Sequence, residues 1–248
     1  MCYSDDARPP LPPIIGGAAA DHGDLHLTAA DGNRMMAYAA RAESPTGRGM
    51  VILPDVRGLH GFYRELTVRF AEAGVDAVAF DYFGRTDADG SRDEGFDWKT
   101  HIAQTTPDSV AADVRAAVEH LRSAEGGRAN YVFSVGFCFG GRESWRQSAR
   151  DHGLCVSIGF YGGQPNSLAA EIPNMKAPLL LLLAGEDFTP REDFRQFEAR
   201  LTEGDIPFTS KTYEGAPHSF FDRTSDQHAD AAADAWRQML DFMVANSK

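Results

Sequence analysis

The stretch Gly136-Phe137-Cys138-Phe139-Gly140-Gly141 decides the fold of this chain. It follows the apolar run Tyr131 to Val135 and precedes residues 142–150, whose pattern predicts a helix closed by Gly153. The order of strand, tight turn and helix places the thiol of Cys138 at the apex of the turn. Glycine lets neighbouring backbone pass closely because it has no Cβ atom. The pattern therefore predicts a nucleophile that projects beyond the sheet edge; the alternative is a structural cysteine in the core.

The rest of the chain alternates apolar strands with helical segments. Residues 25–28 and 35–39 flank the turn pair Asp31-Gly32 and predict a hairpin. Apolar runs then predict strands at 49–53, 75–82, 131–135, 156–161, 177–184 and 208–213, with helices between most of them and a last helix carrying Trp236 inward. Near-continuous apolar strands separated by helices predict an α/β architecture, a mostly parallel sheet covered by helices on both faces.

The domain organisation follows from the distribution of proline and glycine. Residues 1–20 are rich in both and predict an extended N-terminal arm, whereas 21–248 contain no repeat or low-complexity linker and predict one α/β domain. The segment 86–105 is long for an uninterrupted loop. A loop of this length is commonly a lid beside an active site, and a plain surface excursion is the alternative.

Composition and charge exclude several classes of protein. Hydrophobic residues make up 43% of the 248 residues and charged residues 24%, as in globular rather than disordered chains. The net charge of −12 argues against nucleic acid as the main partner, because phosphate recognition needs a basic face. Residues 1–13 do not resemble a signal peptide, and the longest apolar run, 177–184, is too short to cross a bilayer. We therefore expect a cytoplasmic protein that binds no membrane.

The cysteines of the chain are Cys2, Cys138 and Cys155. An odd and sparse set is not a disulfide framework, and the absence of a C-x-x-C pair argues against a zinc site. We expect no metal, and a reduced thiol at Cys138 fits a cytoplasmic location.

Two further residues complete a catalytic constellation. In this architecture the acid and the histidine follow the nucleophile in that order, each just beyond a strand. Asp187 follows the apolar strand 177–184, and His218 follows the strand 208–213. Glu186 and His228 are the competing acid and base; we interpret His228 as part of a solvated face of the last helix. The predicted triad is therefore Cys138, His218 and Asp187, in which the acid orients the base.

The oxyanion of an acyl-transfer intermediate needs hydrogen-bond donors. The backbone N–H of Phe139 comes directly after the proposed nucleophile, and that of Val56 lies in the loop after the strand 49–53. We predict both as donors. His60 lies near the same loop, and its preferred interpretation is a helix-entry residue.

At this point the chain resembles the dienelactone hydrolase family of the α/β-hydrolase superfamily. The motifs that carry the resemblance are Gly-Phe-Cys-Phe-Gly-Gly at 136–141, Ala-Gly-Glu-Asp-Phe-Thr-Pro at 184–190 and Ala-Pro-His-Ser-Phe-Phe-Asp-Arg-Thr at 216–224, with weaker likeness at 51–58 and 80–85. The likeness runs from about Gly49 to the C-terminus. It implies an α/β-hydrolase fold and an enzyme that opens enol-lactone rings in the breakdown of aromatic compounds, without metal or cofactor.

The resemblance also implies roles for Asp55, Arg85 and Arg223. Asp55 would contact the thiol and influence its ionisation; the usual family residue is glutamate, one methylene longer. Arg85 and Arg223 would grip a carboxylate of the substrate. Arg223 stands one residue further from His218 than the family pattern has it, because of the additional residue in Phe220-Phe221-Asp222. A surface role is the alternative for both arginines.

The sequence thus predicts a cysteine hydrolase that opens a small lactone through an acyl-enzyme. Alternatives are a general carboxylesterase or thioesterase of the same fold, and a non-catalytic ligand-binding protein on this scaffold. A redox role for Cys138 is a less favoured hypothesis than these, because no resolving cysteine is evident. The expected partner is a small-molecule lactone or ester, with or without a carboxylate, and the expected assembly is a monomer or a small homo-oligomer.

Overall fold

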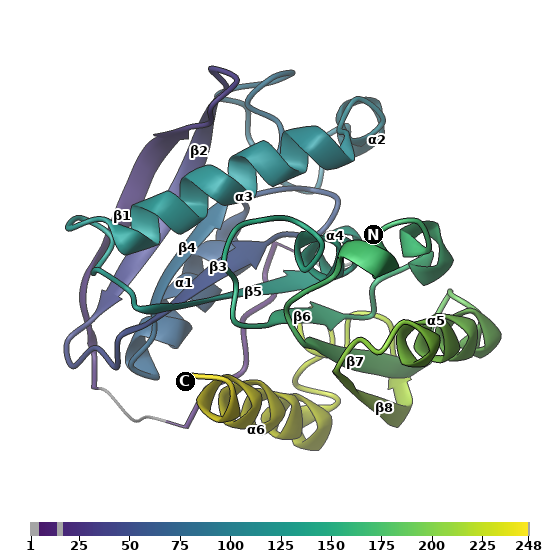
Figure 1. Cartoon of the computed structure of the whole chain (residues 1–248). Coiled ribbons are helices and arrows are strands. Elements are labelled where there is room, and N and C mark those ends of the chain that lie inside the picture. Colours follow the sequence, from purple (N-terminus) through teal and green to yellow (C-terminus); the bar gives the residue numbers. More distant parts are fainter. Residues whose placement is uncertain (1–4, 14–16, 248) are drawn as a thin grey trace.

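A single sheet forms the centre of the computed structural model, which describes residues 5–13 and 17–247 (Figure 1). Its strands lie in the order β1-β2-β4-β3-β5-β6-β7-β8. Their bounds are β1 (Ala19–Thr28), β2 (Arg34–Ala42), β3 (Arg48–Leu53), β4 (Asp76–Phe80), β5 (Tyr131–Phe137), β6 (Ser157–Phe160), β7 (Leu179–Glu186) and β8 (Phe208–Pro217). The predicted hairpin is present as β1 and β2, which pair antiparallel, and β2 pairs antiparallel with β4. The remaining neighbours in the sheet, along β4-β3-β5-β6-β7-β8, all pair in parallel.

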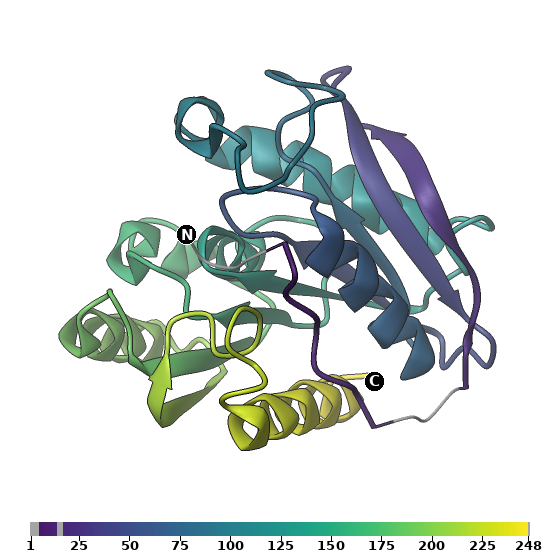
Figure 2. The ribbon, with the colours of Figure 1, turned by 180° about the vertical axis from the view of Figure 1, so that it is seen from behind.

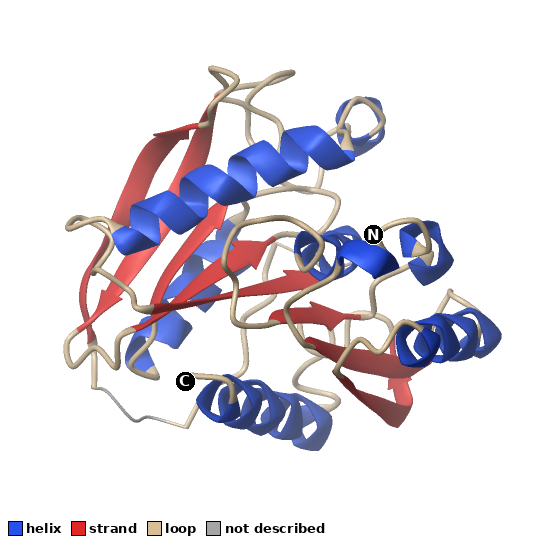
Figure 3. Ribbon diagram, in the orientation of Figure 1, coloured by secondary structure: helices blue, strands red, loops and turns tan. Residues whose placement is uncertain are grey.

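Helices cover both faces of this sheet (Figure 3). Their bounds are α1 (Gly61–Glu72), α2 (Trp98–Ile102), α3 (Pro107–Arg122), α4 (Phe139–Gln147), α5 (Arg191–Glu203) and α6 (Ala229–Ala245), with short 3₁₀ turns at Pro165–Leu168 and Ile172–Asn174. α1 and α6 pack on one face, which Figure 2 shows from the front, and α3, α4 and α5 on the other. The predicted mostly parallel, doubly covered sheet is confirmed.

Strand β3 shows why the parallel strands are apolar on both sides. Met50 and Ile52 belong to the core beneath α1 and α6, whereas Val51 and Leu53 belong to the core beneath α3. Successive side chains of a strand point to opposite faces, so a strand covered on both faces is apolar throughout. No helix within the described ranges, 5–13 and 17–247, is long and apolar enough to cross a membrane.

Two helix starts test the sequence signals directly. At α3 the hydroxyl of Thr106 accepts the backbone N–H of Ser109, the Ser109 hydroxyl accepts that of Thr106, and Pro107 is the first helical residue, as predicted. At α4 the prediction of a helix over 142–150 is wrong at both ends, since the helix covers Phe139–Gln147. Glycine has low helix propensity, yet Gly140 and Gly141 lie inside α4 because packing overrides propensity there.

The segment 86–105 is anchored by a buried arginine. Arg92 Nε lies 2.8 Å from Asp81 Oδ2, and its Nη1 lies 2.9 Å from Asp87 Oδ2. The Arg92 guanidinium also lies over the rings of Phe83 and Phe96. The segment contains α2 and is therefore not an uninterrupted loop. Such anchoring favours a fixed surface excursion over the alternative of a moving lid.

The described part of the predicted N-terminal arm, residues 5–13, lies against the domain. Asp5 pairs with Arg57, the Ser225 hydroxyl donates to the Arg8 carbonyl, and the Trp236 indole N–H donates to the Pro10 carbonyl. Figure 2 shows this segment running between α1 and α6. Residues 1–4 and 14–16 of the predicted arm lie outside the described residues, and residues 19 and 20 belong to β1.

Candidate active site

The turn between β5 and α4 holds Cys138 in an unusual backbone conformation. Its φ is 56° and its ψ is −115°, a region that side-chain-bearing residues rarely adopt. The flanking glycines make the turn possible. A Cβ on Gly136 would lie 1.8 Å from the Gly140 carbonyl oxygen, and one on Gly140 would lie 2.2 Å from the Leu53 carbonyl oxygen. The sequence therefore forms this strained elbow because the flanking positions have no side chain.

An acid and a histidine meet beyond the neighbouring strands. Asp187, at the end of β7, places Oδ2 3.0 Å from Nδ1 of His218, at the end of β8. Both side chains are almost completely buried, with 2% and 7% exposed. The second carboxylate oxygen, Oδ1, accepts the backbone N–H of Thr189 at 2.9 Å. A carboxylate held at both oxygens fixes the ring orientation of His218 and favours the tautomer that carries its proton on Nδ1.

These groups line one pocket of about 440 Å³. Of the predicted residues, the pocket brings together the nucleophile, both triad partners and both oxyanion donors. The lining residues are Val56, Cys138, Phe139, Arg142, Gly163, Gln164, Asp187, Phe188, Thr189, Pro190, Asp193 and His218. Parallel strands end at the same edge of a sheet, so residues beyond β3, β5, β7 and β8 converge there although they are far apart in sequence.

The competing acid and base do not line this pocket. Glu186 is exposed on the surface. His228 is the N-cap residue of α6 and is half-buried, so its predicted place on a solvated face of the helix is only approximate. Within 5–13 and 17–247, no three His, Cys, Asp or Glu side chains are arranged to hold a metal ion.

The two predicted oxyanion donors lie at the wall of the pocket. Phe139 is the first residue of α4, where backbone N–H groups have no partner within the helix. Val56 follows Asp55 in the loop after β3, and its N–H makes no hydrogen bond to the described part of the chain. Two such N–H groups at one cavity form an arrangement that can stabilise a developing negative charge.

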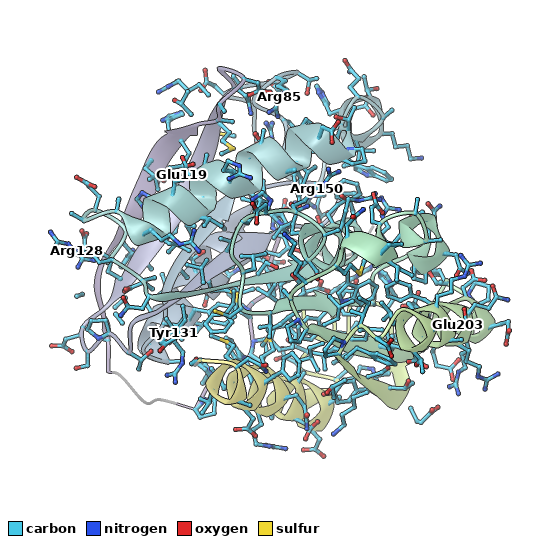
Figure 4. All side chains as sticks on the ribbon, in the orientation of Figure 1. Arg85, Glu119, Arg128, Tyr131, Arg150 and Glu203 are labelled. Atoms are coloured by element: carbon cyan, nitrogen blue, oxygen red, sulfur yellow. The ribbon has the colours of Figure 1, made fainter. Side chains whose placement is uncertain are left out.

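Arg85 lies outside this pocket, contrary to the predicted contact with substrate. Its guanidinium binds Asp113 through Nη1 and Nη2 and Asp31 through Nε and Nη2, at 2.7–3.0 Å. Figure 4 shows Arg85 near the tip of the β1–β2 hairpin. The physical reason is charge, since two carboxylates surround one guanidinium and hold it between the hairpin and α3.

Arg223 also lies away from its predicted contact, whereas the contact of Asp55 with the Cys138 thiol stays a prediction. Arg223 is exposed and is absent from the pocket lining. Asp55 is fully buried; its Oδ1 accepts the backbone N–H of Arg57 at 2.8 Å and lies 4.0 Å from Nε2 of His60. Burial, and then the nearby charge of Arg57, hold the pKa of His60 well below its usual value. The His60 ring also accepts the N–H of Phe62, which confirms its predicted helix-entry role.

Sequence reasoning missed Arg142, Gln164 and Phe188. Arg142 follows Gly141 directly, and the first turn of a helix after an elbow faces the same cavity as the nucleophile. Phe188 follows Asp187 and is 87% exposed, with its ring centroid 5.1 Å from that of His218. Gln164 lies beyond β6, the strand for which no site residue was predicted. Arg142 and Phe188 could have been found in the sequence, because each lies directly beside a motif residue.

Comparison with known proteins places this geometry in a family. The model of the dienelactone hydrolase family matches residues 35–247. The chain belongs to the dienelactone hydrolase family. The predicted family and α/β-hydrolase fold are thereby confirmed, and the chain is a dienelactone hydrolase-like enzyme that acts on carboxylic ester bonds, the bond class to which lactones belong.

Members of the family resemble the chain over most of its length. The carboxymethylenebutenolidase of Rhodococcus opacus is 28% identical over 258 residues, covering 98% of this chain and 96% of that protein. A probable 2-oxo-3-(5-oxofuran-2-ylidene)propanoate lactonase of Bradyrhizobium is 28% identical over 229 residues, covering 86% and 90%. The crystal structure of a putative dienelactone hydrolase from Klebsiella pneumoniae superposes with a TM-score of 0.78 at 24% identity, covering 90% of this chain and 98% of that one.

Proposed function

We propose that this dienelactone hydrolase-like chain opens a small lactone, such as a dienelactone, through a covalent intermediate on Cys138. One observation carries the proposal: the elbow thiol and the Asp187–His218 pair line the same pocket of about 440 Å³. A pocket of this volume suits a small molecule rather than a polymer.

In the proposed first step, His218 accepts the thiol proton while Sγ of Cys138 bonds to the acyl carbon of the substrate. The carbonyl electron pair moves onto oxygen, where the N–H groups of Val56 and Phe139 stabilise the negative charge. Collapse of this oxyanion breaks the acyl–oxygen bond, and the leaving oxygen takes the proton from His218. In a lactone the leaving oxygen stays attached to the acyl group, so the product of this step is a ring-opened thioester.

In the proposed second step, His218 removes a proton from water and the resulting hydroxide attacks the thioester carbon. The same N–H groups stabilise the second oxyanion, and its collapse releases the carboxylic acid and the Cys138 thiolate. The thiolate then recovers its proton from His218. Asp187 stabilises the imidazolium in both steps and does not itself take the proton.

The two cysteines of the described chain provide a matched test. We would measure turnover of trans-dienelactone and of a neutral p-nitrophenyl ester by the wild type, Cys138→Ala and Cys155→Ala, with and without iodoacetamide. Cys155 is half-buried, and burial raises its pKa, so it should alkylate slowly. We expect Cys138→Ala to lose at least about 10⁴-fold in kcat and Cys155→Ala to keep wild-type, iodoacetamide-sensitive activity.

Retained turnover in Cys138→Ala, or no turnover by the wild type, would overturn the proposal. Turnover of the neutral ester alone would instead support a general esterase with the same nucleophile. Arg85 and Arg223 lie outside the pocket lining, and this favours a general esterase as the second candidate function. Mass spectrometry of the quenched reaction should show the acyl group on Cys138.

A further inference from the structure

Arg142 gives the pocket a positively charged group. Among the described residues that line the pocket, it is the only lysine or arginine. It lies in the first turn of α4, four residues after the proposed nucleophile. The acids of the lining are Asp187, which binds His218, and Asp193.

The guanidinium of Arg142 is held from one side. Its Nε lies 3.1 Å from Glu143 Oε1, its Nη1 donates to Gln164 Oε1 at 3.2 Å, and its Cζ lies 5.3 Å from the Phe139 ring centroid. Nη2 makes no hydrogen bond with any residue that the structure describes, and 17% of the side chain is exposed. A guanidinium fixed through Nε and stacked on a ring is oriented before any ligand arrives.

The charge of Arg142 is only partly neutralised by its partner. Glu143 is buried, and its second oxygen, Oε2, binds Arg146 Nε at 2.9 Å. One carboxylate is therefore shared between two arginines. Arg146 has a second acid, Glu171, whereas Glu143 is the only acid that contacts Arg142 within the described ranges.

Gln164 strengthens the same corner of the pocket. It adopts φ 55° and ψ 49°, a left-handed conformation that is uncommon for a residue with a long side chain. Because its Oε1 accepts from Arg142, its side-chain NH₂ remains a donor. Backbone strain that places a polar side chain in a cavity is a frequent mark of a binding residue.

We propose that Arg142 and Gln164 bind a carboxylate of the substrate and make the enzyme selective for anionic lactones or esters. Arg142 would donate through its Nη groups and Gln164 through its amide NH₂, while the acyl carbon lies at Cys138. This proposal rests on the proposed hydrolytic function and assigns the charge recognition to α4 and the loop after β6. It replaces Arg85 and Arg223 in that role.

The test uses two esters of nearly the same shape, the anion 4-acetoxybenzoate and the neutral 4-acetoxybenzamide. We would compare the ratio of kcat/KM for the anionic ester to that for the neutral one in the wild type and in Arg142→Met, which keeps an unbranched, flexible stem but removes the guanidinium and its charge. We expect the wild type to prefer the anion and the ratio to fall about 10-fold or more in Arg142→Met, chiefly through KM. Arg142→Lys should recover part of the ratio.

Matched variants separate local recognition from general charge. Arg195 lies on α5, is 71% exposed at its side chain and is absent from this pocket, so Arg195→Met should leave the ratio unchanged. Asp193→Asn removes a repulsive charge from the lining and should raise the ratio about two- to fivefold. Thermal unfolding of each variant checks that α4 remains folded.

The outcomes distinguish this proposal from the hydrolytic one. Turnover of either ester that disappears in Cys138→Ala supports the nucleophile whatever Arg142 does. An equal ratio in the wild type and Arg142→Met, equal losses for both esters, or a wild-type preference for the neutral ester would overturn the carboxylate assignment alone.

Discussion

Arginines on the two sides of strand β3 differ in the number of carboxylates that contact them. On the hairpin side, Arg85 contacts Asp31 and Asp113, and Arg92 contacts Asp81 and Asp87. On the pocket side, Arg142 contacts one carboxylate and shares it with a second arginine. Both regions follow parallel strands, and family resemblance pointed to the hairpin side, through Arg85, for binding of a substrate carboxylate. The difference teaches that the number of acids around a guanidinium, more than its place in the strand order, decides whether it is available to a ligand.

The largest expected effect comes from the pocket side. Asp187→Asn keeps the shape of the side chain but replaces the acceptor that orients His218, so kcat should fall about 10³- to 10⁴-fold. Steady-state kinetics and a thermal melt measure the two properties separately. If the variant kept wild-type kcat, or lost activity only by unfolding, the functional distinction between the two regions would fail.

The next effect belongs to the hairpin side and concerns stability. Arg92→Met would leave Asp81, which is fully buried, without its ion-pair partner, and should lower the free energy of unfolding by about 3–5 kcal/mol. Chemical denaturation measures the loss. The kcat of the folded fraction should stay within about threefold of wild type, because no residue of 86–105 lines the pocket. A large loss of kcat without a loss of stability would instead support the interpretation of residues 86–105 as a lid.

Buried His152 makes the stability of the fold depend on pH. Burial, followed by the charges of Arg115 and Arg150, lowers the pKa of His152 from 6.5 to about 4. The unfolded chain therefore binds a proton that the folded chain does not between these values, and the stability present above pH 6.5 is lost as the pH falls towards 4. The loss should reach up to about 3 kcal/mol.

Denaturation at several pH values measures this loss. His152→Gln should flatten the dependence of the unfolding free energy on pH between 6.5 and 4. His60, whose pKa is also lowered by burial, should keep part of the slope in that variant. An identical slope in both proteins would show that other groups cause the acid sensitivity.

The smallest effect sharpens the contrast between Arg85 and Arg142. Arg85 is 26% exposed and its partner Asp113 is buried, so Arg85→Met should cost about 1–3 kcal/mol of stability. It should not alter the preference between 4-acetoxybenzoate and 4-acetoxybenzamide. A fall in that preference equal to the one in Arg142→Met would restore Arg85 as a substrate ligand.

Much of this architecture could be read from the sequence because it depends on local patterns. Apolar runs predicted the strands, and the Thr106-Pro107 signal predicted the start of α3. The order of Cys138, Asp187 and His218 predicted a shared pocket, since parallel strands end at one edge of the sheet. Glycines obscured the start of α4, where close contact with the Leu53 carbonyl outweighs helix propensity.

The identity of the charged residues in the pocket could not be read in the same way. The position of a guanidinium depends on which distant acids surround it, and Asp31 and Asp113 lie 54 and 28 residues from Arg85. No local pattern records such contacts. Family resemblance pointed to Arg85 and Arg223, whereas the lining of the cavity identified Arg142, whose place beside the elbow motif was the only signal in the sequence.

The packed arm has a consequence for how the chain is made. Pro10 lies in this arm and precedes Trp236, whose indole N–H donates to the Pro10 carbonyl, by 226 residues. The arm therefore cannot dock between α1 and α6 until α6 has been synthesised. Its attachment is expected to be a late event in folding, after the sheet has formed.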